Sequence, residues 1–68
     1  MTFKELRESK RFTRPALAER VGVDPKTISF LEDGTVRDPR GSTLLGLAKA
    51  FRVSMERVYQ AIQNTKAA

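Results

Sequence analysis

Only two residues, Gly22 and Val23, separate two predicted helices in the first half of this chain. Glycine readily takes the left-handed backbone conformation that ends a helix. Asp24 and Pro25 follow directly, and an N-cap aspartate before a proline at the first helical position is a typical helix start. The sequence therefore predicts two helices that meet at a tight turn, over roughly residues 13–34.

Further helix-start signals lie on both sides of this turn. Thr2 and Glu5 have the spacing of a capping box, in which two side chains satisfy free backbone N–H groups, and this helix is expected to run to about Lys10. Thr13 can cap the helix that precedes the tight turn, and Ser54 can cap the last helix of the chain. A further amphipathic segment, marked by Leu44, Leu47, Ala48 and Phe51, precedes the last helix. Together, these signals predict five helices.

Each predicted helix also has an apolar face, and the alternation typical of strands is absent from the sequence. A loop from Thr35 to about Gly41 separates the third helix from the fourth. We therefore expect an all-α fold, a compact five-helix domain over residues 1–63, followed by a frayed tail at 64–68. The expected inward-facing residues are Phe3, Leu6, Phe12, Leu17, Ala18, Val21, Ile28, Leu31, Leu44, Leu47, Ala48, Phe51, Val58 and Ile62.

The composition excludes several classes of function. The chain has 68 residues with neither cysteine nor histidine, which removes disulfides, thiolate chemistry, the usual zinc sites and histidine acid–base catalysis. It also has no glycine motif of the kind that cradles phosphates. We therefore expect no enzyme activity, no metal, no cofactor and no small-molecule ligand.

Hydropathy indicates where the chain resides. No apolar run approaches the ~20 residues needed to span a bilayer. The first residues lead straight into alternating charges, without the apolar stretch of a signal peptide. We therefore expect a cytoplasmic protein without a membrane partner.

Charge favours a polyanionic partner without identifying it. Thirteen Lys and Arg against eight Asp and Glu give a net charge of +5. Two short helices joined by a glycine-containing turn also form the unit that places its second helix in the major groove of DNA, although similar hairpins occur in proteins that bind no DNA.

The outer face of the third helix carries residues suited to reading bases. If Ile28 and Leu31 point inward, Lys26, Ser29 and Phe30 lie on the outer sides. Lysine donates to guanine, serine can contact either base class, and a phenyl face can meet a thymine methyl group. Two alternatives remain, namely that Phe30 packs in the core and that Lys26 is simply a solvated side chain.

Other polar groups near this helix are suited to phosphate, which fixes the register of a protein on DNA and supplies much of the affinity. Nothing in the sequence gives Arg14 a structural partner. Arg7 and Glu32 differ from the set, because each lies within one turn of an apolar stripe, and we expect them to form an ion pair between the first and third helices. The candidate phosphate contacts are Thr13, Arg14, Thr27, Thr35, Arg37 and Arg40.

Three segments closely resemble the Xre family of phage-repressor and Cro-like helix-turn-helix proteins. They are residues 13–23 (TRPALAERVGV), 27–34 (TISFLEDG) and 44–54 (LLGLAKAFRVS), and the likeness extends over about residues 3–62. The resemblance is specific because the alanine, glycine, isoleucine and Glu-x-Gly positions fall together at the family spacing.

The resemblance implies a lambda-repressor-like domain that binds operator DNA, usually as a two-fold dimer on a near-palindrome. The function it implies is that of a transcriptional regulator, and we expect a repressor. Position by position, it places Arg14 at a phosphate anchor, Arg40 at a loop arginine that reaches the minor groove in some members, and Arg7 and Glu32 at an interhelical ion pair. The base-facing sites fall on Pro25, Lys26, Ser29 and Phe30.

The chain departs from the family pattern at three points. Arg14 stands where glutamine is most frequent, which changes its expected hydrogen bonds. Phe30 replaces a polar or basic residue, which favours a thymine methyl contact over hydrogen-bond readout. Gly41 and Gly46 are expected to weaken the fourth helix by up to about 1 kcal/mol each, and to alter the surface available to a dimer.

Two other functions compete with a sequence-specific regulator. An antitoxin-like or adaptor module would use the helix hairpin to bind a protein, and an architectural protein would bind DNA without sequence preference. Dimer contacts would have to use the last two helices, and Met55, Val58 and Tyr59 are the candidates, although an ordinary place in the core is the stronger expectation for them.

Overall fold

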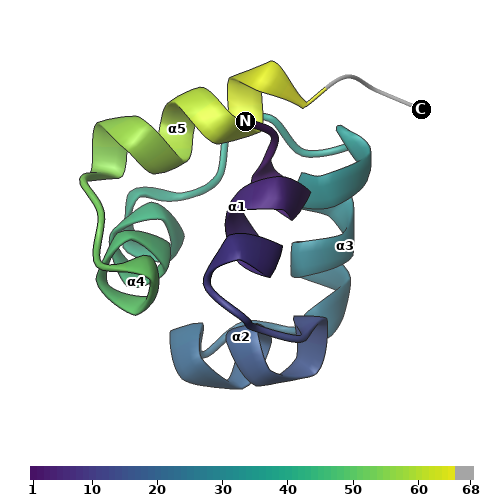
Figure 1. Cartoon of the computed structure of the whole chain (residues 1–68). Helices are drawn as coiled ribbons and strands as arrows, with labels where there is room; N and C mark the ends of the chain where they lie inside the picture. The colour runs from purple at the N-terminus through teal and green to yellow at the C-terminus, as the bar shows by residue number, and fades with distance from the viewer. Residues whose placement is uncertain (66–68) are drawn as a thin grey trace.

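The chain forms five helices and no strand within residues 1–65, which are the residues that the computed structural model describes. Figure 1 shows the helices wrapped around one centre, with α2 at the opposite end of the molecule from α5. The predicted all-α, five-helix fold is confirmed. The helices are α1 (Phe3–Ser9), α2 (Arg14–Val21), α3 (Pro25–Asp33), α4 (Gly41–Phe51) and α5 (Met55–Asn64).

Side-chain caps start four of these helices, as the sequence predicts. The Glu5 N–H donates to the Thr2 hydroxyl at 3.2 Å while the Thr2 N–H donates to Glu5 Oε1 at 2.8 Å, which completes the capping box of α1. The backbone N–H and side chain of Thr2 also lower the pKa of Glu5. Thr13, Asp24 and Ser54 accept from the first turns of α2, α3 and α5.

The tight turn between α2 and α3 is present where the sequence predicts it. Gly22 ends α2 with φ 85°, the left-handed region in which a side chain is strained. Its N–H and that of Val23 both donate to the Ala18 carbonyl, at 2.8 and 3.0 Å. The chain then enters α3 directly, and α2 and α3 pack against each other.

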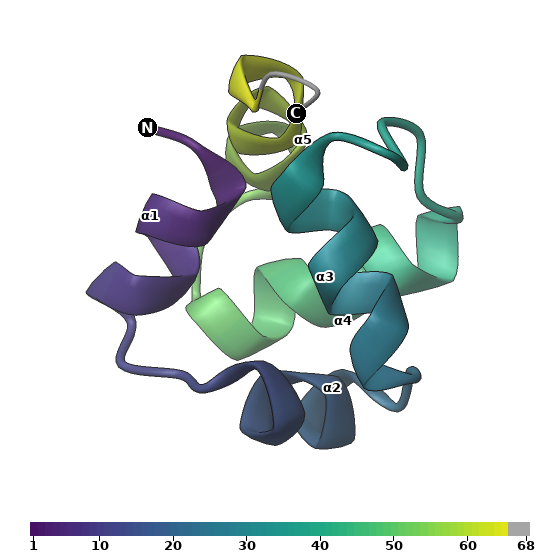
Figure 2. The same ribbon diagram turned by 90° about the vertical axis from the view of Figure 1, so that its right-hand side faces the viewer.

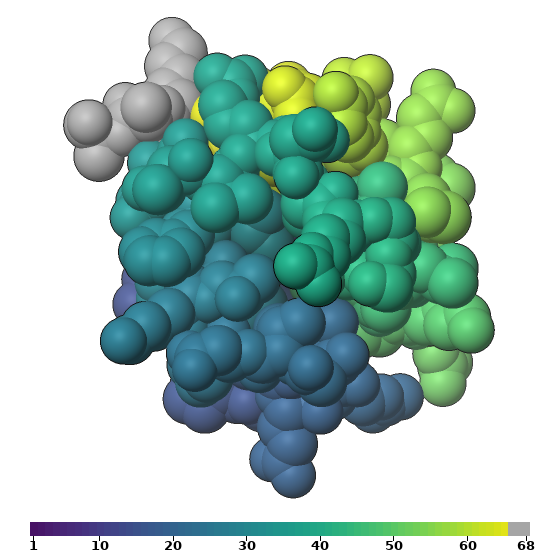
Figure 3. Space-filling view, turned by 180° about the vertical axis from the view of Figure 1, so that it is seen from behind, coloured from purple at the N-terminus to yellow at the C-terminus, as the bar shows by residue number. Residues whose placement is uncertain are grey.

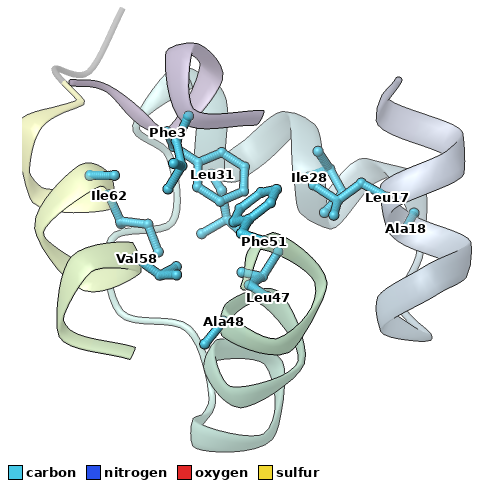
Figure 4. Close-up of a cluster of buried hydrophobic side chains, with 12 residues drawn as sticks. Phe3, Leu17, Ala18, Ile28, Leu31, Leu47, Ala48, Phe51, Val58 and Ile62 are labelled. Carbon is cyan, nitrogen blue, oxygen red and sulfur yellow. The ribbon is translucent and has the colours of Figure 1, made fainter. Parts of the chain in front are cut away.

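All five helices contribute to one core, in which aromatic rings meet edge to face. Phe51 lies 6.0 Å from Phe3 and 6.0 Å from Phe12 between ring centres, and Figure 4 shows it among side chains from the other helices. Because α3 contributes only one side to this core, its other side faces outward (Figure 2). The buried core residues are Phe3, Leu6, Leu17, Ala18, Ile28, Leu31, Leu47, Ala48, Phe51, Val58, Ala61 and Ile62.

The predicted frayed tail starts too early in the sequence. Asn64 is the last residue of α5, and Thr65 is only 4% exposed. The Thr65 hydroxyl accepts from the Phe3 N–H at 3.1 Å and donates to the Ala61 carbonyl at 3.0 Å. A tail beginning at 64 is therefore wrong for these two residues, and 66–68 lie outside the described residues.

Gly46 has a packing role that helix propensity does not show. A Cβ atom built on Gly46 would lie 2.9 Å from Val21 Cγ1, closer than real Cβ atoms approach a neighbour. The bare backbone of α4 therefore lets α2 come close at this point. Gly41, the first residue of α4, has open space in the same position.

This difference predicts opposite effects for the same substitution at two places in α4. Gly41→Ala is expected to raise the free energy of unfolding by up to about 1 kcal/mol, because alanine costs less backbone entropy in a helix. Gly46→Ala is expected to lower it by about 1 kcal/mol net, because overpacking against the stiff, β-branched Val21 outweighs the gain in propensity. Urea denaturation followed by circular dichroism measures both, and an equal stabilisation by the two variants would contradict the packing role.

Candidate nucleic-acid interface

The outer face of α3 is open to solvent. Ile28 and Leu31, on its inner side, are 0% exposed. Figure 2 shows α3 at the surface of the domain, and Figure 3 shows it on one face of the molecule together with α2, the following loop and α4. This helix can therefore meet a partner without any rearrangement of the core.

The predicted base-facing residues lie on that open face. Pro25, Lys26 and Phe30 are exposed, and Ser29 is half-buried beside them. Phe30 keeps 42% of its surface exposed, so the alternative that it packs in the core is wrong. A phenyl ring left in water at the centre of a helix face is an apolar contact available to a partner.

The start of α3 is fixed by its cap. Asp24 Oδ1 accepts from the Lys26 N–H at 2.8 Å, and Pro25 occupies the first helical position. Lys26 thus extends from a rigid first turn rather than from a mobile loop. The aspartate also places one negative charge beside this lysine.

The loop after α3 and the start of α4 form a shallow groove of about 450 Å³ next to the turn. Thr27 and Arg40 both line it, so the structure brings these two predicted phosphate contacts together. Two acidic residues, Asp24 and Asp38, line the same groove. Arg40 is the N-cap of α4 and gives that helix no side-chain cap, because a guanidinium has no acceptor for the backbone N–H groups of a helix start.

The two remaining threonines lie at helix ends. The Thr13 hydroxyl accepts from the Ala16 N–H at 3.2 Å, which leaves its O–H as a donor. Thr35 follows the Gly34 cap of α3, and its N–H donates to Asp33 Oδ1 at 2.8 Å. The side chain and backbone of Thr35 lower the pKa of Asp33 by hydrogen bonding to its carboxylate.

Arg37 has a structural role that the sequence did not indicate. Its Nη2 donates to the Gln63 carbonyl at 2.9 Å, and Gln63 Nε2 donates back to the Arg37 carbonyl at 2.7 Å. These bonds hold the loop after α3 against α5. No local pattern signals such a pair, because the two residues are 26 positions apart.

Glu32 joins two arginines rather than one. The expected interhelical pair is present, since Arg7 Nε donates to Glu32 Oε2, and Arg7 Nη1 donates to the Phe12 carbonyl. Arg14 Nε also donates to Glu32, at Oε1 and 3.0 Å, so the expectation that Arg14 lacks a structural partner is wrong. The Arg7 and Glu32 side chains are only 9% and 4% exposed, whereas that of Arg14 is 48% exposed.

Two negative findings hold for the part of the chain that the structure describes. Within residues 1–65, no three Asp or Glu side chains come together as a group that could hold a metal ion. None of the five helices is long and apolar enough to cross a membrane.

Comparison with known proteins identifies the family of the chain. The model of a helix-turn-helix family matches residues 3–58, from the first residue of α1 into α5. Searches of curated proteins and of solved structures found no match to the chain.

Proposed function

Since this chain belongs to the Xre family of helix-turn-helix DNA-binding regulators, we propose that it represses transcription by reading a near-palindromic operator with α3. The observation that carries the proposal is the open outer face of α3, which presents a basic, a hydroxyl and an aromatic side chain from a rigid helix. A helix of this kind fits the width of the major groove.

Each exposed side chain of α3 has a defined chemistry toward bases. Lys26 donates to guanine O6 or N7, and the half-buried Ser29 supplies a hydroxyl that suits either base class. Phe30 places an apolar ring where it can contact a thymine methyl group. Pro25, the first residue of α3, lies at the helix end that approaches the bases in this family.

Phosphate contacts come from the groups that surround α3. Thr13 and Arg14 act from the start of α2, and Thr27 and Arg40 act from the two sides of the groove. Thr35 and Arg37 extend the contact along the loop, in which Arg37 is already held in place by Gln63. We propose that Arg40 binds a backbone phosphate at the edge of the minor groove.

The operator is bound by two copies of the chain in this proposal. Leu45, Met55 and Tyr59 are exposed by 43%, 38% and 40%, although they are large apolar side chains on α4 and α5. The expectation of an ordinary core position is therefore wrong for Met55 and Tyr59, whereas it is confirmed for Val58. Exposed apolar groups on these helices support a dimer contact there.

Selection from a pool of random DNA duplexes at two salt concentrations tests the proposal. We expect a retained palindromic motif with half-sites about 10 base pairs apart, the separation set by one helical turn. Retention without an enriched motif, lost at higher salt, would instead indicate an architectural protein. Failure to retain any duplex would favour the antitoxin-like or adaptor role.

Arg40→Ala is expected to weaken binding to all duplexes alike, because the guanidinium contacts the DNA backbone. Removal of one phosphate contact makes the negative slope of log K against log salt shallower by about 0.9. Lys49→Ala is the matched control, since it removes one exposed positive charge from α4 outside the candidate interface. Titrations of labelled operator at several salt concentrations measure both slopes, and equal slopes for the two variants would contradict a backbone contact by Arg40.

A further inference from the structure

The carboxylate of Glu32 is fixed in place before any ligand binds. One oxygen, Oε2, accepts from Arg7 Nε, and Arg7 is itself held by the Phe12 carbonyl. The Glu32 side chain is only 4% exposed. Glu32 cannot swing toward solvent without leaving the Arg7 charge buried and unpaired, which is strongly unfavourable.

The second oxygen of this carboxylate holds Arg14 by one nitrogen only. Arg14 Nε donates to Oε1 at 3.0 Å, and within residues 1–65 neither Nη1 nor Nη2 of Arg14 has a hydrogen-bond partner. The guanidinium is planar and rigid, so a bond to Nε orients the Nη1–Nη2 edge as well. With Nε bonded to Glu32, that edge remains to bind two phosphate oxygens at once.

We propose that Glu32 is a positioning residue for DNA binding, which orients Arg14 so that its Nη1–Nη2 edge receives a backbone phosphate. The proposal rests on the proposed function, in which Arg14 contacts the operator backbone. An exposed arginine otherwise loses the freedom of a long side chain when it binds, and a fixed carboxylate removes much of that cost beforehand. The three charges of Arg7, Glu32 and Arg14 sum to +1, so the cluster still attracts a phosphate.

The same carboxylate therefore serves both the fold and the interface. Its bond to Arg7 joins α1 to α3, and its bond to Arg14 joins α3 to the start of α2. The orientation of Arg14 toward a phosphate therefore depends on the same carboxylate that joins α1 to α3.

A double-mutant cycle on operator affinity separates positioning from simple structural support. Arg14→Ala is expected to weaken binding about 10-fold in the native chain, the effect of losing a charged hydrogen bond. In a host that carries Arg7→Leu and Glu32→Leu, which replaces the buried pair with apolar side chains, the same substitution is expected to cost less than about threefold. Lys49→Ala is the control and should have the same effect in both hosts.

The outcomes of this cycle are distinct for the two proposals. An equal loss on Arg14→Ala in both hosts would overturn the positioning role while leaving the regulator function intact. A native chain that selects no duplex would overturn the proposed function, and the positioning role with it.

A second measurement uses the unmodified chain and does not depend on the host folding. The Arg14 Nε–Hε signal, assigned by nuclear magnetic resonance, is expected to be protected from solvent exchange in the free protein. It should remain protected after operator is added, because phosphate binds the other edge of the guanidinium. Loss of this protection on binding would show that Arg14 leaves Glu32 to reach the DNA, which overturns the proposal.

Discussion

Glu32→Gln is expected to lower the free energy of unfolding by about 3 kcal/mol, because it leaves the buried Arg7 charge without a partner. A domain of 68 residues has a total stability of about 3–10 kcal/mol at roughly 0.05–0.15 kcal/mol per residue. The substitution therefore removes a large part of what keeps the chain folded. Urea denaturation at neutral pH, followed by circular dichroism, measures the change.

Two further variants determine whether the loss comes from the buried pair. Arg14→Gln removes the other, half-exposed partner of Glu32 and is expected to cost less than about 1 kcal/mol, as for a surface ion pair. Joint replacement by Arg7→Leu and Glu32→Leu is expected to restore most of the stability, because no buried charge is then left unpaired. If Arg14→Gln destabilises the chain as much as Glu32→Gln does, the burial of Arg7 is not the cause.

Lys26→Ala is expected to relax the choice of base at one position of each half-site, by about 1–3 kcal/mol between the preferred base pair and the others. The physical reason is that Lys26 extends from the first turn of α3, where its ammonium group can donate to guanine, and alanine offers no donor there. Competition between the selected operator and its single-base variants measures the change.

The control for this prediction is a variant that acts on the backbone instead. Arg40→Ala should weaken binding to the operator and to all of its variants by the same factor, which leaves the base preference unchanged. Uniform weakening by Lys26→Ala would place that lysine on a phosphate rather than on a base. Together, the two variants distinguish a contact that selects bases from a contact that only binds the DNA backbone.

Most of the helix boundaries are encoded locally and could be predicted. Each of Thr2, Thr13, Asp24 and Ser54 acts on backbone groups within three residues of itself, so its role is visible in a short window of sequence. Gly22 likewise acts through its own backbone angle. The fold class follows from such signals together with the apolar faces that they delimit.

The contacts that the sequence did not reveal all join distant parts of the chain. Arg14 meets Glu32 across 18 positions, and Arg37 meets Gln63 across 26. The need for a glycine at position 46 depends on how closely α2 approaches α4, which no pattern within α4 records. The pairing of Arg7 with Glu32 could be predicted from the sequence only because charged residues next to an apolar stripe need a partner.

The hydrogen bond between Phe3 and Thr65 has a consequence for the synthesis of the chain. A ribosome releases the N-terminal segment first, yet the backbone N–H at the start of α1 obtains its buried acceptor only from a residue 62 positions later. The start of α1 thus lacks this hydrogen-bond acceptor while most of the polypeptide is being made. The domain is therefore expected to reach its native state after Thr65 has emerged, as one cooperative step rather than helix by helix.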